Sequence, residues 1–156
     1  MAVNRVSNSE ELYIGGRWTA ATNHIEVTDL AEGGTFTRVA AATPAEAEEA
    51  LAAAKSAEVE MRELSVVQRA DWMISIADGI EARKEELAEV IVREAGKPIS
   101  SARGEVDAAA ERFRRAAEEA RSLDGEYIEG STDGHEGWRA IVRKQPVGTV
   151  LCITPS

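Results

Sequence analysis

The 156-residue sequence is poor in cysteine, histidine and aromatic residues, with one, two and seven of them. The single Cys152 excludes an internal disulfide framework. His24 and His135 are far apart in the sequence, and neither has another donor at the spacing of a metal site. We therefore expect no structural metal, and a core built mainly from Ala, Val, Leu and Ile.

The sequence also lacks a long uncharged apolar stretch. Its first ten residues contain no apolar core of signal-peptide length, and no later stretch is long enough to span a bilayer. From this we expect a cytoplasmic protein without a membrane partner.

Basic residues are outnumbered, and lysine is scarce among them. There are 18 basic residues, 14 of them Arg and 4 Lys, against 28 acidic residues, which gives a formal net charge of −10. Because phosphate groups repel such a chain, nucleic acid and anionic membranes are poor partners. High acidity with few lysines is typical of proteins from salt-loving organisms, and an acidic mesophilic protein is the alternative.

Four helices are expected in the middle of the chain. Two begin with capping boxes, at Thr43 to Glu46 and at Ser65 to Gln68, where side chains satisfy free amides of the first turn. The third runs from about Arg83 to Ala95 and stops at Gly96, and the fourth from about Ile99 to Leu123.

Apolar residues recur at helical spacing in these segments and predict the buried faces. In the first helix the face is narrow and made of small residues, which favours close packing: Ala47, Ala50, Leu51 and Ala54. In the second helix it consists of Val66, Ala70, Met73, Ile74, Ala77 and Ile80. In the fourth helix it consists of Ala102, Val106, Ala109, Phe113, Ala116 and Ala120.

The ends of the chain are expected to form strands. Near the N-terminus a strand over Leu12 to Trp18, with two glycines in its middle, and a strand over His24 to Asp29 suggest a hairpin that turns at Ala20 to Asn23. Further extended segments are expected at the following positions: Thr35 to Ala42, Glu126 to Glu129 and Trp138 to Lys144.

Val147 to Ile153 is an uncharged, nearly continuous apolar run, which is typical of a strand buried on both faces of a parallel sheet. Such a strand needs neighbouring strands and covering helices, and a parallel crossover takes a dozen residues or more. Only three residues follow it. We therefore expect the sequence to be the beginning of a longer fold, truncated at its first core strand.

Four motifs in this order resemble the aldehyde dehydrogenase superfamily. They are Leu12 to Trp18, Glu94-Ala95-Gly96-Lys97-Pro98, Glu105-Val106, and Gly148 to Pro155. Together with the helices between them they extend the resemblance over essentially the whole chain. The surroundings of Lys97 and Glu105 are most similar to the lactaldehyde or non-phosphorylating glyceraldehyde-phosphate branch.

The resemblance implies an α/β fold, with residues 1–156 forming an incomplete domain. Residues 1–125 correspond to the hairpin and helical part of an NAD(P)-binding domain, and residues 126–146 to an arm used in oligomerisation. Residues 147–156 correspond to the first core strand of the nucleotide-binding sheet. A homo-oligomer is therefore implied for the full-length family.

The resemblance also implies an enzyme that oxidises aldehydes to carboxylic acids with NAD or NADP. The family's nucleophilic cysteine, oxyanion-binding asparagine and general-base glutamate have no counterpart in this sequence, so we expect no catalytic residue and no activity of the chain alone. The strand end at Ile153, Thr154 and Pro155 corresponds to the border of the cofactor cleft. A non-catalytic interaction or oligomerisation fragment, or the product of a disrupted gene, is the alternative.

Several other residues are expected to have structural or solvated positions. Cys152 lies inside the apolar run without a basic neighbour, which indicates a structural residue rather than a nucleophile. His24 and His135 are expected at the surface, and Lys97 near the end of a helix whose negative pole it compensates. The loop from Gly130 to Gly137 lacks the strand and helix of a phosphate loop and is expected to be a flexible arm.

Overall fold

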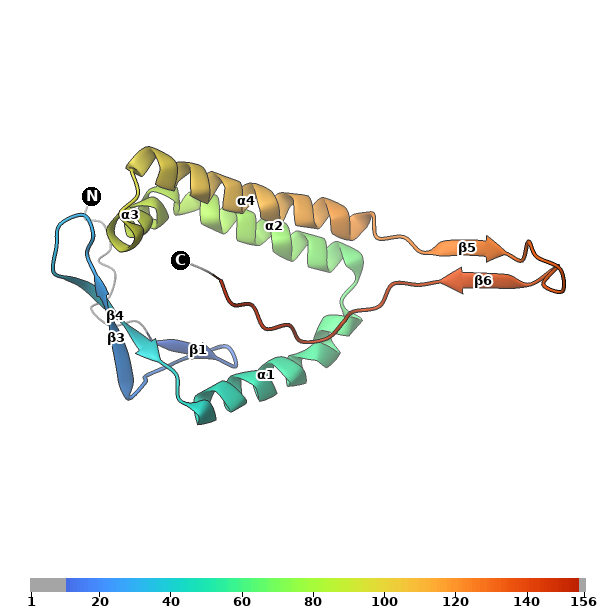
Figure 1. Ribbon diagram of the computed structural model, residues 1–156, viewed down its shortest axis with the longest axis horizontal. Helices are drawn as coiled ribbons and strands as arrows, with labels where there is room; N and C mark the ends of the chain where they lie inside the picture. Colours follow the sequence, from blue (N-terminus) through green and yellow to red (C-terminus); the bar gives the residue numbers. More distant parts are fainter. Residues whose placement is uncertain (1–10, 155–156) are drawn as a thin grey trace.

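The computed structural model describes residues 11–154 and contains four helices and three antiparallel hairpins (Figure 1). In chain order the elements are β1 (Leu12–Ile14), β2 (Arg17–Thr19), β3 (Asn23–Thr28), β4 (Thr35–Ala41), α1 (Pro44–Glu63), α2 (Val66–Ala82), α3 (Lys84–Ala95), α4 (Ile99–Arg121), β5 (Glu126–Glu129) and β6 (Arg139–Val142). The strands and helices agree with the expected α/β class.

The first hairpin differs from the prediction in the position of its turn. Strand β1 pairs with β2, with Ile14 opposite Arg17, so Gly15 and Gly16 form the two-residue turn. Both glycines have positive φ angles, 56° and 81°, which such a tight turn requires and other residues rarely adopt. The predicted turn at residues 20–23 was wrong because these glycines reverse the chain earlier.

The second hairpin joins β3 to β4. Its register places Ile25 opposite Val39 and Glu26 opposite Arg38, with an irregularity between Val27 and Thr28. Arg38 and Glu26 form an exposed ion pair of 2.8 Å across the two strands. The predicted extended segment from Thr35 is therefore confirmed as a strand, paired with the segment that contains His24.

Helix α1 begins at the predicted capping box. The Thr43 side chain accepts a hydrogen bond from the N–H of Glu46, and the Glu46 carboxylate accepts one from the N–H of Thr43. None of the residues of α1 is buried. The expected close packing of its small-residue face was wrong for this structure, so the helix depends largely on its cap and its helix-forming residues.

Helices α2, α3 and α4 form the main packed unit, with α2 and α4 side by side along their length (Figure 1). Its core is made of small side chains, since the buried residues of the three helices are Ala70, Ala77, Ala88, Ala102, Val106, Ala110 and Ala117. Alanines allow the helix axes to approach closely, which compensates for the scarcity of large aromatic residues.

The predicted apolar faces of these helices were partly correct. Ala102 and Val106 are buried as expected, but Ala116 is exposed, and Ala110 and Ala117 are buried in its place. Val66 lies in the first turn of α2 and remains 37% exposed. The shift has a geometric cause. The predicted positions alternate steps of four and three residues, which averages 3.5 residues per turn, whereas an α-helix has 3.6. The face that is buried therefore moves away from the predicted positions along the helix.

Ion pairs connect the exposed edges of the three packed helices. Arg114 of α4 binds Asp78 and Glu81 of α2 at 2.9 and 2.6 Å. Arg103 binds Glu85 at 2.6 Å, linking α4 to α3. These pairs are solvent-exposed, so each contributes little to stability.

The third hairpin, β5 with β6, projects from the helices (Figure 1). Glu126 lies opposite Val142 and Glu129 opposite Arg139, and every residue of both strands is exposed. The predicted strand over Glu126 to Glu129 is confirmed, whereas β6 is shorter than the predicted strand from Trp138 to Lys144.

Beyond β6, the chain runs through the space that Figure 1 shows between α1 and the pair of α2 and α4. Residues 143–154 contain no strand, although Val147 to Ile153 were expected to form one. Val147 is 91%, Leu151 83% and Ile153 85% exposed. The physical reason is that a strand needs a hydrogen-bonding neighbour, and no other strand pairs with this segment within residues 11–154.

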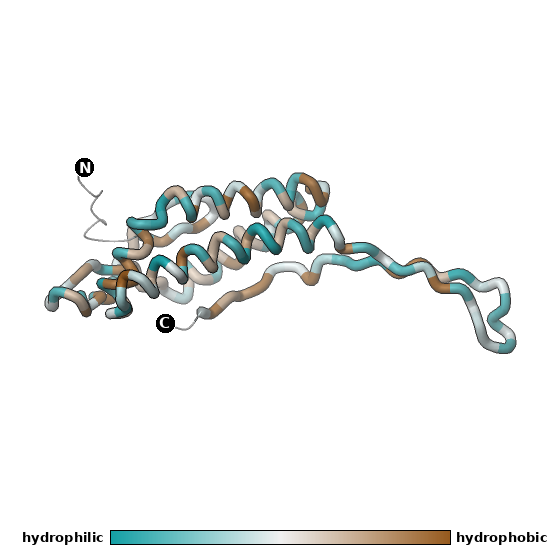
Figure 2. The backbone as a smooth tube through the Cα atoms, turned by 90° about the horizontal axis from the view of Figure 1, so that it is seen from above, coloured by the Kyte–Doolittle hydropathy of each residue, from teal (hydrophilic) through white to brown (hydrophobic). Residues whose placement is uncertain are grey.

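The surface of the chain is large for its size. The accessible surface is 12346 Å², whereas a compact monomer of this length exposes roughly 7,700 Å². Figure 2 shows that the apolar end of the described chain lies apart from the helices rather than within a core. No helix between residues 11 and 154 is long and apolar enough to cross a membrane.

Candidate functional site

The predicted cofactor-bordering residues lie at the open end of the last segment. Ile153 is 85% exposed and Thr154 is also exposed. Pro155 lies outside the described residues. The role of these positions at a cofactor cleft stays a prediction.

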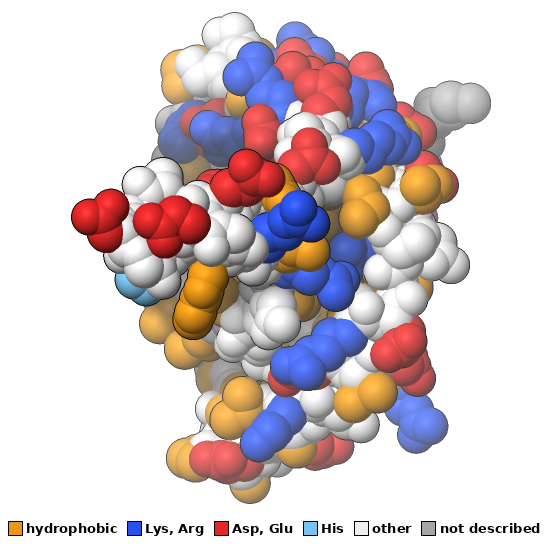
Figure 3. Space-filling view, turned by 90° about the vertical axis from the view of Figure 1, so that its right-hand side faces the viewer, with side chains coloured by type: hydrophobic (Ala, Val, Ile, Leu, Met, Phe, Trp, Pro, Cys, Tyr) orange, Lys and Arg blue, Asp and Glu red, His pale blue; other side chains and the backbone are white. Residues whose placement is uncertain are grey.

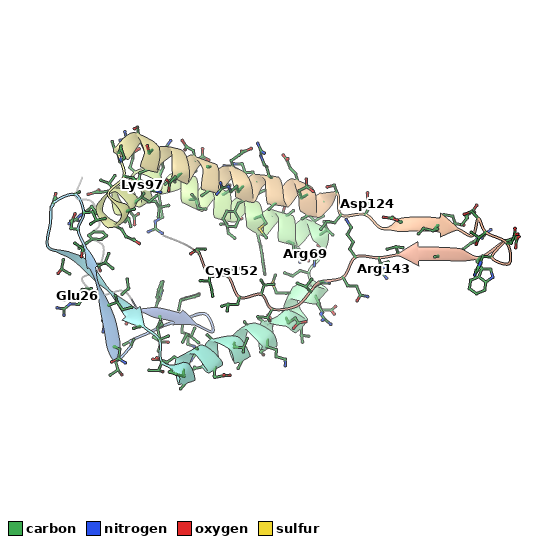
Figure 4. All side chains as sticks on the ribbon, in the orientation of Figure 1. Glu26, Arg69, Lys97, Asp124, Arg143 and Cys152 are labelled. Carbon is green, nitrogen blue, oxygen red and sulfur yellow. The ribbon has the colours of Figure 1, made fainter. Side chains whose placement is uncertain are left out.

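A cavity of about 400 Å³ lies earlier along the same segment. One wall comes from a single face of α1, where lining residues are spaced by four, three and one positions: Ala54, Glu58, Met61 and Arg62. The opposite wall comes from Pro146, Gly148 and Thr149, and Arg69 of α2 completes the lining. Two consecutive helices and a segment that is distant in sequence therefore meet there (Figure 4).

The charges of this cavity are only partly paired. Arg62 binds Glu58 at 2.6 Å, one helical turn away. The side chain of Arg69 is half-buried and has no ion pair or hydrogen bond with another residue of the described chain. The lining therefore carries one uncompensated positive charge in a protein whose net charge is −10.

A buried carboxylate occurs at a different place, in the loop between β3 and β4. Asp29 is 2% exposed, and its carboxylate accepts hydrogen bonds from the N–H groups of Ala31 and Glu32 at 3.0 and 2.9 Å. The Glu32 N–H in particular, together with the guanidinium of Arg93, holds the pKa of Asp29 below its ordinary value, while burial opposes this shift. Both carboxylate oxygens of Asp29 therefore accept hydrogen bonds, one from the two loop amides and the other from Arg93 of α3, so the carboxylate has a structural role.

The remaining residues singled out in the sequence do not form a chemical centre. Cys152 is exposed, contrary to the expectation of a buried strand position, because its segment forms no strand and pairs with none. His24 is exposed as expected. His135 is also exposed, with its ring 3.1 Å from the Thr132 hydroxyl and edge-on to Trp138, and Lys97 pairs with Glu105 at 2.6 Å.

A nicotinamide cofactor does not fit the described residues by themselves. Ile153 and Thr154 offer one exposed edge, and the turn of the β5 and β6 hairpin is not followed by a helix that could bind a phosphate. Among residues 11–154 no group of three potential metal ligands comes together. The part of the chain that the structure describes can border a site but does not complete one.

Sequence reasoning missed both the cavity and the buried carboxylate. The spacing of Asp29 and the glycines at 33 and 34 indicates a tight loop, and this was a usable signal for the carboxylate. Nothing in the sequence placed Arg69 near Gly148, because that proximity arises from the path of the last segment.

The chain belongs to the aldehyde dehydrogenase family, whose family model matches residues 18–155. It is 36% identical over 145 residues to the NADP-dependent glyceraldehyde-3-phosphate dehydrogenase of Streptococcus equinus. The matched residues cover 92% of this chain and 30% of that protein. It is 34% identical to the 3-sulfolactaldehyde dehydrogenase of Priestia aryabhattai, with the same two coverages. The names agree with the branch that the sequence motifs indicated.

A solved structure shows the same arrangement of elements. The NADP-dependent glyceraldehyde-3-phosphate dehydrogenase from Bacillus halodurans C-125, complexed with NADP, matches with a TM-score of 0.85 and 30% identity, over 90% of this chain and 30% of that one. The chain thus spans about 30% of the length of the relatives that it matches. Both glyceraldehyde-3-phosphate dehydrogenases are NADP-dependent by name.

Proposed function

We propose that this chain supplies the N-terminal part of an enzyme that oxidises an aldehyde to a carboxylic acid with NAD or NADP. In this proposal residues 1–125 form the first layer of the cofactor-binding domain. Residues 147–156 provide the first strand of its sheet.

The observation that carries this proposal is the state of the last segment. Val147, Leu151 and Ile153 are almost fully exposed, although their sequence is that of a strand buried on both faces. An apolar segment with unpaired backbone groups is stabilised by strand pairing and burial. The likeness to the NADP complex supports a dehydrogenase sheet as the neighbour.

Within this proposal, Ile153, Thr154 and Pro155 border the cofactor. Ligands of parallel α/β sheets bind beyond the carboxyl ends of the strands, and these residues occupy that end of the expected strand. Their part would be to shape one side of the cleft, and NAD or NADP, when bound there, would supply the hydride-accepting chemistry.

A chimera tests the proposal directly. The corresponding N-terminal segment of the Bacillus halodurans enzyme would be replaced by residues 1–156, and NADPH formation from glyceraldehyde 3-phosphate would be followed by absorbance. We expect an active chimera, and no activity from the 156-residue chain alone. A soluble, folded chimera that fails to bind NADP would contradict the proposal.

Substitution within the chimera separates cofactor contact from folding. Thr154→Arg is expected to weaken NADP binding at least about tenfold without lowering the Tm, because it adds bulk at the proposed cleft border. Lys97→Gln is the control, since Lys97 pairs with Glu105 at the junction of α3 and α4. Equal NADP affinities for the two variants would exclude a role for Thr154.

A second candidate function is a non-catalytic association module, and the projecting hairpin favours it. Tyr127 is 58%, Trp138 68% and Ile141 75% exposed on or next to β5 and β6. Aromatic and aliphatic side chains on an exposed hairpin are typical of a contact surface. Light scattering of the chain and of its Ile141→Lys variant tests this candidate, which requires a defined oligomer that the substitution dissociates.

A further inference from the structure

We draw no further inference here: the strongest candidate, the pocket lined by His135, Trp138 and Arg139 at the tip of the projecting hairpin (Figure 3), belongs to the arm that the family resemblance already implies for oligomerisation, and nothing among residues 11–154 shows what covers it.

Discussion

Arg93 of α3 and Asp29 of the loop between β3 and β4 form an ion pair across 64 positions of the sequence, with Nε of Arg93 2.7 Å from Oδ2 of Asp29. The guanidinium also lies 4.3 Å from the centre of the Phe36 ring. The Arg93 carbonyl accepts a hydrogen bond from the N–H of Leu30 at 2.7 Å. This cluster attaches the second hairpin to the helical unit.

Asp29→Asn is expected to lower stability in a pH-dependent way. The native pKa of Asp29 is lowered from its ordinary value of 3.8, so its contribution is complete above that value and is lost as pH falls through the native pKa. Urea unfolding midpoints should therefore differ between the two proteins at pH 7, and the difference should shrink as the pH falls below 3.8. Glu26→Gln, at an exposed pair, is the control, and a pH-independent difference for Asp29→Asn would refute the assignment.

Val106→Ala should destabilise the packed helices by about 2 kcal/mol, because it removes two buried methyl groups and leaves a cavity beside Ala88 and Ala102. Val59→Ala is the matched control, since Val59 on α1 is 69% exposed and the change should stay within about 0.5 kcal/mol. Urea denaturation measures both. Similar losses for the two variants would mean that α1 packs as tightly as α4.

Thr43→Ala should fray α1 without unfolding the other helices. Loss of a helix cap costs about 1 kcal/mol, and α1 has no buried residue to compensate. Hydrogen exchange should accelerate in residues 44–50 and remain unchanged in α2 and α4. Uniform acceleration throughout the chain would show instead that α1 unfolds together with the rest.

Cys152 should react with a thiol reagent almost as fast in the native chain as in urea, because it is exposed on an unpaired segment. In the active chimera it should be protected, since the segment then pairs as a strand. The measurement is the rate of thiol modification at fixed pH. Protection in the isolated chain would reveal association through residues 147–153.

Salt should raise the stability of the chain. The net charge is −10, and screening reduces repulsion among the excess carboxylates. Screening also weakens the exposed ion pairs, such as that between Arg114 and Glu81. The stability lost in this way is smaller than the stability gained, because each pair contributes little. Unfolding free energies in rising potassium chloride measure the balance, and a steady decrease would show that ion pairs outweigh repulsion and would remove support for a halophilic origin.

The helices were predictable because their signals are local. Capping boxes at Thr43 and Ser65 and the glycine at 96 act within one turn, and they appear where the sequence placed them. The turn at Gly15 and Gly16 was missed because two adjacent glycines are also compatible with an interrupted strand. The family resemblance was also readable, since its motifs are continuous in the chain.

The sequence by itself determined the helical segments, the acidic charge and the membership of the family, since each rests on neighbouring residues or on composition. Only the tertiary structure decided which alanines of α4 are buried, that Asp29 and Arg93 meet, and that Arg69 and Gly148 line the same cavity. It also left the apolar side chains of Val147, Val150, Leu151 and Ile153 exposed. The physical reason is that helix caps and turns are satisfied within a few residues, whereas burial and strand pairing require partners from distant parts of a chain.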